Sequence, residues 1–275
     1  MGANSKPAAS VELQATERFA NQVVVVTGGT SGIGLATCKL FARQGAKVVF
    51  CGRRAALGQA AQQAISQAGG QAEYVQADVR VEDDVARLIE QARQRYGSLD
   101  IVVANAGITV QKALHSYSTA EWQDVIDTNL RGGFFTLKHS VPPMLAAGGG
   151  RILVIASSVA NVAGAAQSAY VASKAGLVGM VRSAALDYGD KGIRINAILP
   201  GTTDTALVRR AAGMENVPDA AWQVGAAQWG KSAVRGLKRM ARPEEIAAFI
   251  VAMASPDLTF ATGAALSSDG GTGAG

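Results

Sequence analysis

The sequence has few of the residues that build disulfide frameworks, metal centres or aromatic surfaces. Its 275 residues include two cysteines, two histidines and 5% aromatic residues. Two thiols make no disulfide framework, and Cys38 and Cys51 are not spaced with histidine as zinc ligands are. We therefore interpret both cysteines as small hydrophobic residues of the core, and we expect no metal site.

Long apolar runs are missing as well. No uncharged apolar stretch reaches the roughly 18 residues that a transmembrane helix requires. Residues 1–20 contain no continuous apolar segment like that of a signal peptide, so we expect them to form a flexible tail. These absences predict a protein that does not associate with membranes and is located in the cytoplasm.

Acidic residues are outnumbered by basic ones, which gives the chain a net charge of +5. The basic residues are mostly scattered singly over the expected helices, and this pattern argues against nucleic-acid binding. Phosphate groups on a small ligand would account for part of the basic excess.

Short β-branched runs alternate with longer amphipathic segments along most of the chain. Runs such as VVVV and IVVA show no alternation of apolar and polar residues, which indicates strands covered on both faces. The expected strands are 22–27, 47–51, 72–76, 101–105, 151–157, 194–199 and 265–268. The expected helices are 32–44, 55–68, 81–96, 120–146, 168–188 and 243–254. This order is typical of βαβ units with right-handed crossovers and a parallel sheet.

We therefore predict an α/β fold, with a single Rossmann-type domain at residues 21–271. Its doubly wound parallel sheet of about seven strands would carry helices on both faces. The segment 202–240 lacks the strand–helix rhythm and contains Trp222 and Trp229. Because it follows a strand end, where open α/β sheets bind ligands, we interpret it as a helical substrate lid. An oligomer contact made by the two tryptophans is the alternative, and residues 272–275 are expected to be a tail.

A glycine-rich loop follows the first expected strand and precedes the first expected helix. Glycine permits positive φ in a tight turn and lets the backbone approach a pyrophosphate. The helix N-terminus presents N–H groups and the positive end of its dipole to the anion. This position predicts a dinucleotide site whose contacts are Gly28, Thr30, Ser31, Gly32, Ile33 and Gly34.

The end of the second expected strand indicates which dinucleotide binds. An acidic residue there would bind the ribose hydroxyls of NAD, but the chain has Arg53 and Arg54. Their guanidinium groups suit the 2′-phosphate of NADP, so we expect NADP(H) to be preferred. An NAD(H)-dependent alcohol dehydrogenase is the alternative, if both arginines are only solvated surface residues.

Two further strand ends are expected to contact the cofactor. After the third strand, the Asp78 carboxylate could accept a hydrogen bond from the adenine amine, and Val79 follows it. After the fourth, the small residues Asn105, Ala106 and Gly107 would let the chain pass close to the cofactor.

A pair of residues with acid–base potential lies on one expected helix. Tyr170 and Lys174 are four residues apart and therefore share a helix face. A tyrosine with its ordinary pKa near 10 is a poor catalyst at neutral pH, and a neighbouring ammonium would favour its phenolate. Ser157, at a strand end, could hydrogen-bond a substrate oxygen. Asn129 is a polar residue inside an expected helix.

Together these motifs resemble the short-chain dehydrogenase/reductase family, in particular its 3-oxoacyl-carrier-protein-reductase-like branch. The resemblance extends from about residue 20 to residue 271. It is carried by the TGGTSGIG loop, the NAG triplet, the tetrad of Asn129, Ser157, Tyr170 and Lys174, the Pro200-Gly201 pair, and the closing Asp269-Gly270-Gly271. It implies an enzyme that transfers a hydride between a nicotinamide cofactor and a carbonyl or secondary alcohol of a small molecule.

The resemblance also implies a role for each site residue. Tyr170 would be the general acid in reduction and the general base in oxidation, and Lys174 would lower its pKa and bind the nicotinamide ribose. Ser157 would orient the carbonyl oxygen; its rival Ser158 is disfavoured by the family spacing to Tyr170. Asn129 would hold a water in a proton relay. The further cofactor contacts carried over are Tyr170, Lys174, Pro200, Gly201, Thr203 and Thr205.

Two residues depart from the family pattern. Many members that prefer NADP have a basic residue where this chain has Ser31, which leaves Arg53 to support the NADP prediction. Many members have a hydrophobic residue where this chain has Thr203, which weakens the prediction of that one contact.

Two other functions stay open at this point. A catalytically silent protein that senses the cofactor ratio would keep the fold, although all four tetrad residues are present. A reductase of carrier-linked acyl groups would attract an acidic carrier protein through Arg209, Arg210, Lys231, Arg235, Lys238 and Arg239. Finally, the resemblance implies a homotetramer held largely by the helices that bear Asn129 and Tyr170.

Overall fold

A computed structural model describes residues 17–274 of the chain. Within this range, seven parallel strands form one sheet in the order β3-β2-β1-β4-β5-β6-β7. The strands are β1 (Val23–Val26), β2 (Lys47–Gly52), β3 (Gln71–Gln76), β4 (Ile101–Ala104), β5 (Gly150–Ile155), β6 (Ile193–Pro200) and β7 (Ala265–Ser268). The strand order reverses between β1 and β4, which is the switch point of a doubly wound sheet. The predicted fold class is therefore confirmed, with strand ends shifted by two residues at most.

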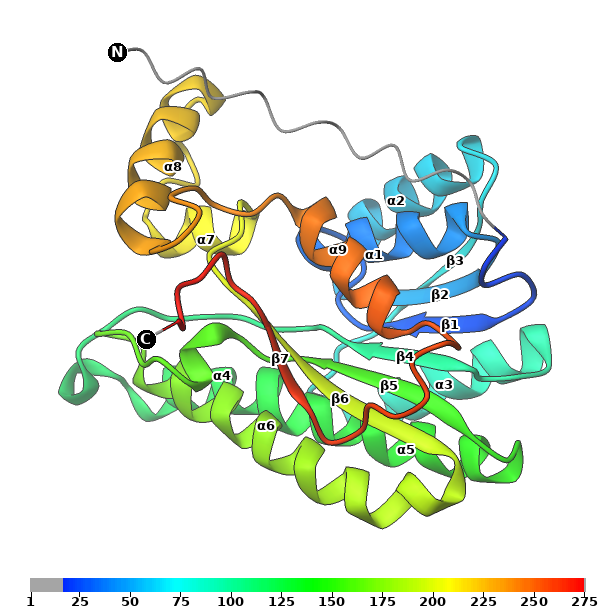
Figure 1. The fold of residues 1–275 in the computed structure, drawn as a ribbon. Helices are drawn as coiled ribbons and strands as arrows, with labels where there is room; N and C mark the ends of the chain where they lie inside the picture. Colours follow the sequence, from blue (N-terminus) through cyan, green and yellow to red (C-terminus); the bar gives the residue numbers. More distant parts are fainter. Residues whose placement is uncertain (1–16, 275) are drawn as a thin grey trace.

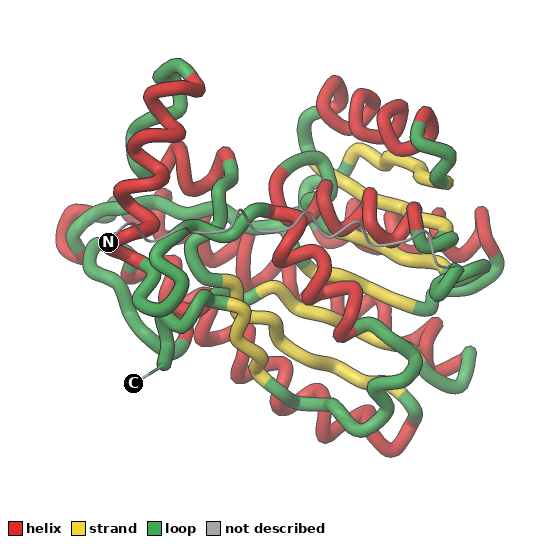
Figure 2. Tube along the Cα trace, turned by 45° about the horizontal axis from the view of Figure 1, so that its top comes forward, coloured by secondary structure: helices red, strands yellow, loops and turns green. Residues whose placement is uncertain are grey.

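Helices cover both faces of the sheet (Figure 1). They are α1 (Gly32–Arg43), α2 (Ala55–Gln67), α3 (Glu82–Tyr96), α4 (Thr119–Ile126), α5 (Gly132–Ala146), α6 (Ser168–Tyr188), α7 (Ala206–Ala211), α8 (Asp219–Ala233) and α9 (Pro243–Met253). One face carries α1, α2 and α9, and the other carries α3 to α6. Figure 2 shows the strands as a single layer between these two sets of helices. The pair α7 and α8 stands apart, beyond the carboxyl ends of the strands.

The burial of β1 explains why its sequence shows no alternation of apolar and polar residues. All four of its valines are fully buried. Val23 and Val25 belong to the core on the side of α3, α5 and α6, whereas Val24 and Val26 belong to the core on the side of α1 and α9. Both faces of a central parallel strand are buried, so both sets of side chains must be apolar.

The helix α3 has well-defined ends because its charges match the helix dipole. Its first turn contains Glu82, Asp83 and Asp84, and its last turn contains Arg93 and Arg95. Carboxylates at the N-terminus and cations at the C-terminus are both favourable. This first turn follows β3 closely, so it brings the Asp84 carboxylate to the edge of the sheet where the strands end.

The predicted helix 120–146 is interrupted, which corrects that part of the sequence analysis. A π-helical turn, Asp127–Arg131, separates α4 from α5. One extra residue in a turn shifts the phase of the helix that follows but leaves the helical composition unchanged, so the sequence analysis did not detect it. Turns of this kind are rare and occur often at functional sites; here the turn carries Asn129 into the interior, where it is 1% exposed.

Both ends of the domain extend beyond the predicted limits of 21 and 271. Phe19 is fully buried and packs edge-on against Phe41, with ring centroids 5.0 Å apart. At the other end, the Gly273 N–H donates to Asp269 at 3.0 Å. Residues 1–16 of the predicted tail, and Gly275, lie outside the described residues. No helix within the described range is long and apolar enough to span a membrane.

The helices α7 and α8 form a small core of their own. Trp222 is 3% exposed and packs with Ala226 and Met240, while Trp229 is partly buried at the edge of this cluster. The Trp222 indole N–H donates to the Asp204 carboxylate at 2.7 Å. Trp222 therefore stabilises this segment itself and is not left free for an oligomer contact. The lid function of residues 202–240 stays a prediction.

Candidate active site

A cleft of about 640 Å³ opens where the strands end, beside the switch point between β1 and β4. It is lined by residues at the ends of six strands, β1 to β6, or just after them, and by parts of α6 and α7. Every residue predicted above to bind the cofactor lines this cleft, and so do Ser157, Tyr170 and Lys174. The fold thus brings together residues that are far apart in the sequence.

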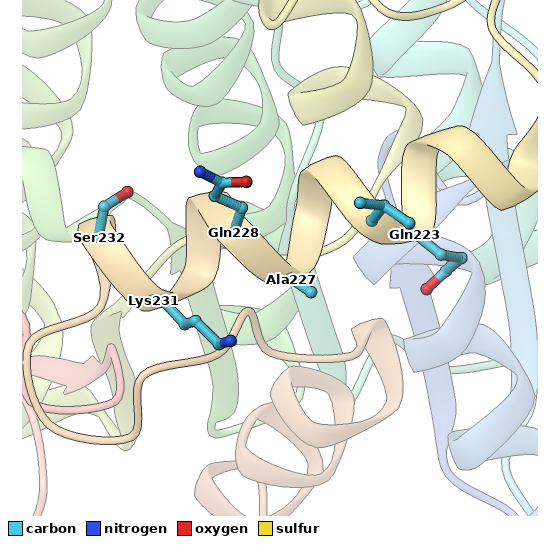
Figure 3. A pocket seen from close by; sticks show the side chains of 6 residues that line it. Gln223, Ala227, Gln228, Lys231 and Ser232 are labelled. Carbon is cyan, nitrogen blue, oxygen red and sulfur yellow. The ribbon is translucent and has the colours of Figure 1, made fainter.

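A second hollow, of about 800 Å³, lies along α8 and is not the site of the predicted chemistry. Its lining residues within the described range all come from this one helix: Gln223, Val224, Ala227, Gln228, Lys231 and Ser232. Figure 3 shows Gln228 and Ser232 on one side of the helix and Ala227 and Lys231 on the other. Lys231 is the one ionisable side chain among these lining residues, so we place the functional site in the cleft at the strand ends.

The glycine-rich loop is packed too tightly for larger residues. Gly28 has a φ of +67°, and a Cβ atom there would lie 2.8 Å from the Ala106 Cα atom. A Cβ atom on Gly34 would lie 2.3 Å from the carbonyl oxygen of Gly28. The Asn105 side-chain amide supports the loop by donating to the carbonyl oxygens of Thr27 and Gly28 at 3.0 and 3.1 Å. Asn105, the first residue of the NAG triplet, therefore holds the loop in shape.

The first turn of α1 keeps its N–H groups available. Its N-cap residue, Ser31, makes no side-chain capping hydrogen bond, although serine is one of the preferred capping residues. Unpaired N–H groups and the helix dipole bind anions at such an end. Together with the close backbone of the loop, this arrangement fits a dinucleotide pyrophosphate.

Arg53 and Arg54 are both exposed at the rim of the cleft. Within residues 17–274, no carboxylate lies within ion-pair distance of either guanidinium group. Two adjacent arginines without acidic partners in the described part of the chain fit an anionic group on the ligand.

The Asp78 carboxylate has a partner that the sequence analysis missed. Arg80 donates to both of its oxygens, at 2.6 to 3.1 Å, and also pairs with Asp124 of α4 at 2.6 Å. Partial burial opposes ionisation of Asp78, but these Arg80 contacts prevail and hold its pKa below the ordinary value. Asp78 is thus a fixed carboxylate, and Arg80 connects the end of β3 to α4.

Asn129 lies behind the cleft and connects its two sides. Its Oδ1 atom accepts from the Ile108 N–H at 2.8 Å, and its Nδ2 atom donates to the Ile108 carbonyl and the Ser173 hydroxyl, both at 2.9 Å. Ser173 in turn donates to the carbonyl of Tyr170 at 2.7 Å. The side chain therefore links the segment after β4 to the turn of α6 that carries Tyr170.

Lys174 is a buried lysine at the base of the cleft. It is 3% exposed, and its Nζ atom donates to the Ile155 carbonyl at 2.8 Å. The same Nζ atom lies 5.6 Å from the centroid of the Tyr170 ring. Burial disfavours the ammonium and lowers the pKa of Lys174 to about 8, a shift expected of desolvation.

Tyr170 carries its hydroxyl into the same region. Burial raises the pKa of the Tyr170 phenol, and a hydrogen bond with the Ser157 hydroxyl opposes this shift. In the protein alone the pKa stays above its ordinary value, so the phenol is the resting form at neutral pH. Ser157 reaches the cleft from the end of β5, whereas its rival Ser158 lies buried in the next turn and is not among the lining residues.

Several lining residues escaped the sequence analysis. Ile108, Thr109 and Thr128 line the cleft beside the tetrad, and the hydroxyls of both threonines are buried without a partner among the described residues. From the lid segment, the cleft is lined by Ala206, Leu207, Val208 and Arg210. The position of this segment after β6 indicated that it borders the cleft. Its weak apolar pattern did not indicate which of its side chains face the cleft.

The six basic residues considered for a carrier protein do not share one environment. Arg209 pairs with Asp219 at 2.7 Å, and Arg239 pairs with Glu245 at 2.6 Å. Arg210 lines the cleft, and Lys231 lies along α8. The structure thus does not bring the six together as a single basic patch.

Comparison with known proteins gives a consistent result. A family model described as short chain dehydrogenase matches residues 22–216. Cis-4-hydroxycyclohexanecarboxylate dehydrogenase of Sinomonas cyclohexanicum is 43% identical over 93% of this chain and 98% of the relative. A 3-oxoacyl-[acyl-carrier-protein] reductase of Chlamydia trachomatis serovar D is 36% identical over 91% of this chain and 97% of the relative.

A solved structure has the same architecture. The crystal structure of levodione reductase matches with a TM-score of 0.84 at 33% identity, covering 93% of this chain and 99% of that one. Both the sequence relatives and this structural match span almost the entire chain.

Proposed function

The chain belongs to the short-chain dehydrogenase/reductase family of oxidoreductases, and we propose that it is an NADP(H)-dependent member in which Tyr170 is the general acid and base. Its relatives are dehydrogenases and reductases that act on CH–OH and C=O groups, and the family uses NAD or NADP. The observation that carries the proposal is the meeting of Ser157, Tyr170 and Lys174 in the same cleft as the glycine-rich loop.

Tyr170, Ser157 and Lys174 each have a distinct role in the proposed reaction. When bound, the nicotinamide cofactor supplies the hydride in reduction or accepts it in oxidation. Tyr170 donates a proton to the carbonyl oxygen in reduction and removes one from the hydroxyl in oxidation. Ser157 donates a hydrogen bond that orients the same oxygen. The Lys174 ammonium favours the phenolate and so makes the Tyr170 proton easier to transfer.

Asn129 acts from behind these groups. Its carboxamide positions Ile108 and Ser173, so it keeps the two sides of the cleft in register. We propose that it also helps to order a water in the path by which the proton returns to solvent. That role falls to atoms other than its Nδ2, which already donates to two protein groups.

The substitution Tyr170→Phe tests the acid–base proposal. It removes the transferable proton and leaves the ring, so kcat should fall by about 100-fold or more, while the Kd for NADPH changes little. The matched control is Tyr188→Phe at the far end of α6, outside the cleft, which should keep normal turnover. A Tyr170→Phe enzyme with near-normal kcat would show that another group transfers the proton.

The preference for NADP(H) is supported by Arg53 and Arg54. Both are exposed at the cleft, and neither has a carboxylate partner within residues 17–274. The end of β2 also lacks the carboxylate that would bind the ribose hydroxyls of NAD and repel a 2′-phosphate. We therefore propose that these guanidinium groups bind the 2′-phosphate.

We propose a secondary alcohol on a saturated ring, or the matching ketone, as the substrate class. One relative at 43% identity is named for a hydroxylated cyclohexane. The cleft of this chain presents the apolar residues Ile108, Leu207 and Val208, which would bury ring carbons favourably.

We further propose that the enzyme is a homotetramer located in the cytoplasm. The family resemblance implies the tetramer, and exposed apolar residues support it; the location rests on the sequence analysis. On the helices named in the prediction, Phe134 and Leu145 of α5 and Leu186 of α6 are 46%, 38% and 86% exposed. These side chains are available for a contact with another copy of the chain.

A further inference from the structure

Two adjacent arginines of α7 point in different directions. Arg209 faces the small core of the lid: it pairs with Asp219 at 2.7 Å, bonds the Met214 carbonyl at 3.0 Å and stacks on the Trp222 ring. Arg210 is rotated by about 100° from it around the helix and lines the cleft. Ala206 and Leu207, four and three residues earlier, share this face and line the cleft as well.

Arg210 has no acidic partner within residues 17–274, and the cleft offers it none. The ionisable side chains that line the cleft, other than the tyrosine and the cysteine, are Arg53, Arg54, Asp78, Lys174 and Arg210. Asp78 is held by Arg80, and Lys174 is buried against a carbonyl. The charge left to face a ligand is therefore cationic, at Arg53 and Arg54 just after β2 and at Arg210 on α7.

Arg210 is separated from the part of the cleft that fits phosphates. The N-cap residue of α7, Thr205, lies against the glycine-rich loop: a Cβ atom on Gly32 would be 3.2 Å from its methyl group. Arg210 follows five residues later, about 7 Å along the helix axis. Between them on the same face is Leu207, one of the apolar residues that would contact a ring substrate.

We infer that Arg210 is a specificity-determining residue that binds an anionic group on the substrate. A guanidinium group binds a carboxylate with two parallel hydrogen bonds, which fixes both its position and its orientation. The preferred substrate is thus a ketone or secondary alcohol that carries a carboxylate away from the reacting carbon. This inference rests on the proposed function, because it names the substrate class of the same cleft.

The experiment compares two ketones, one with a carboxylate and one in which a methyl ester removes its charge. The probes are 4-oxocyclohexanecarboxylate and its methyl ester, each reduced with saturating NADPH by wild type, Arg210→Ala and Arg210→Lys. Wild type should prefer the acid in kcat/KM. Arg210→Ala should lose about 10- to 100-fold in kcat/KM for the acid, the usual worth of a charged hydrogen-bonded contact, and little for the ester. Arg210→Lys should recover part of the loss.

The matched control is Arg235→Ala, which removes the same charge from an exposed residue outside the cleft. It should leave the acid-to-ester ratio unchanged. An acid-to-ester ratio that is equal in wild type and Arg210→Ala would overturn the inference and leave the proposed function intact. A weaker Kd for NADPH in Arg210→Ala with an unchanged ratio would assign Arg210 to a cofactor phosphate instead. Lack of turnover with either ketone would overturn the proposed ring-ketone substrate class, and this inference with it.

Discussion

Replacing Lys174 by methionine should change the pH dependence of stability in a defined direction. Burial lowers the pKa of Lys174 from 10.5 to about 8 in the folded protein. Below pH 8 both folded and unfolded chains hold the proton, and the folded state bears the full cost of a buried ammonium. Between pH 8 and 10.5 the folded state releases the proton while the unfolded state keeps it, so stability rises with pH. The shift corresponds to about 3 kcal/mol.

Lys174→Met removes this dependence. The unfolding free energy of wild type relative to Lys174→Met should therefore rise by about 3 kcal/mol from pH 8 to 10.5. The lost hydrogen bond to the Ile155 carbonyl adds a constant offset, because a neutral amine still donates it. Urea denaturation of both proteins at several pH values measures the difference, and other titrating groups cancel because both chains contain them.

The matched control is Lys39→Met, which removes an exposed lysine of α1. Its effect on the unfolding free energy should stay nearly constant over the same range. If the difference between wild type and Lys174→Met is also constant, Lys174 is not a buried ammonium and the electrostatic part of the proposed mechanism is wrong. The same variant should lose most of its turnover, because no charge remains near Tyr170.

Two further predictions concern the cofactor and the assembly. Arg53→Ala should weaken NADPH binding by about 10-fold or more, the usual worth of a charge-assisted contact, and leave NADH binding almost unchanged. Fluorescence titration measures both dissociation constants. Tighter binding of NADH than of NADPH by wild type would contradict the NADP assignment. Light scattering should give a mass of four chains, and Phe134→Glu should lower it by placing a charge on an exposed apolar surface; a wild-type protein with the mass of one chain would refute the tetramer.

Most of the fold was predictable because parallel strands leave a strong signal. The runs at β1 and β4 are apolar at every position, since each strand is buried on both faces. The glycine-rich loop could be placed because its position between β1 and α1 has a backbone reason, the positive φ of Gly28. The interruption of the helix before α5 could not be predicted, since a π-helical turn shifts the helix phase without changing its composition.

The parts of the site that stayed hidden depend on side-chain partners. Asp78 was expected to accept a hydrogen bond from the adenine amine, and the sequence analysis did not foresee that Arg80, two residues later, donates to both of its oxygens. The sequence holds both residues and says nothing of the turn that brings them together. Asn129 was predicted to be a polar residue inside a helix. Its hydrogen-bond partners Ile108 and Ser173 could not be predicted, because they belong to segments distant in the sequence.

The two arginines of α7 show most clearly what a sequence pattern cannot predict. Arg209 and Arg210 are chemically identical neighbours, and both were counted among six basic residues of one type. Their environments differ because the helix begins at Ala206, after Thr205 accepts the capping hydrogen bond from Val208 at 3.3 Å. That starting point sets the phase, which directs Arg209 into the lid and Arg210 into the cleft. A start one residue later would move Arg210 into the position that Arg209 now holds, so the capping residue, and not the charge pattern, decides which residue lines the cleft at this point.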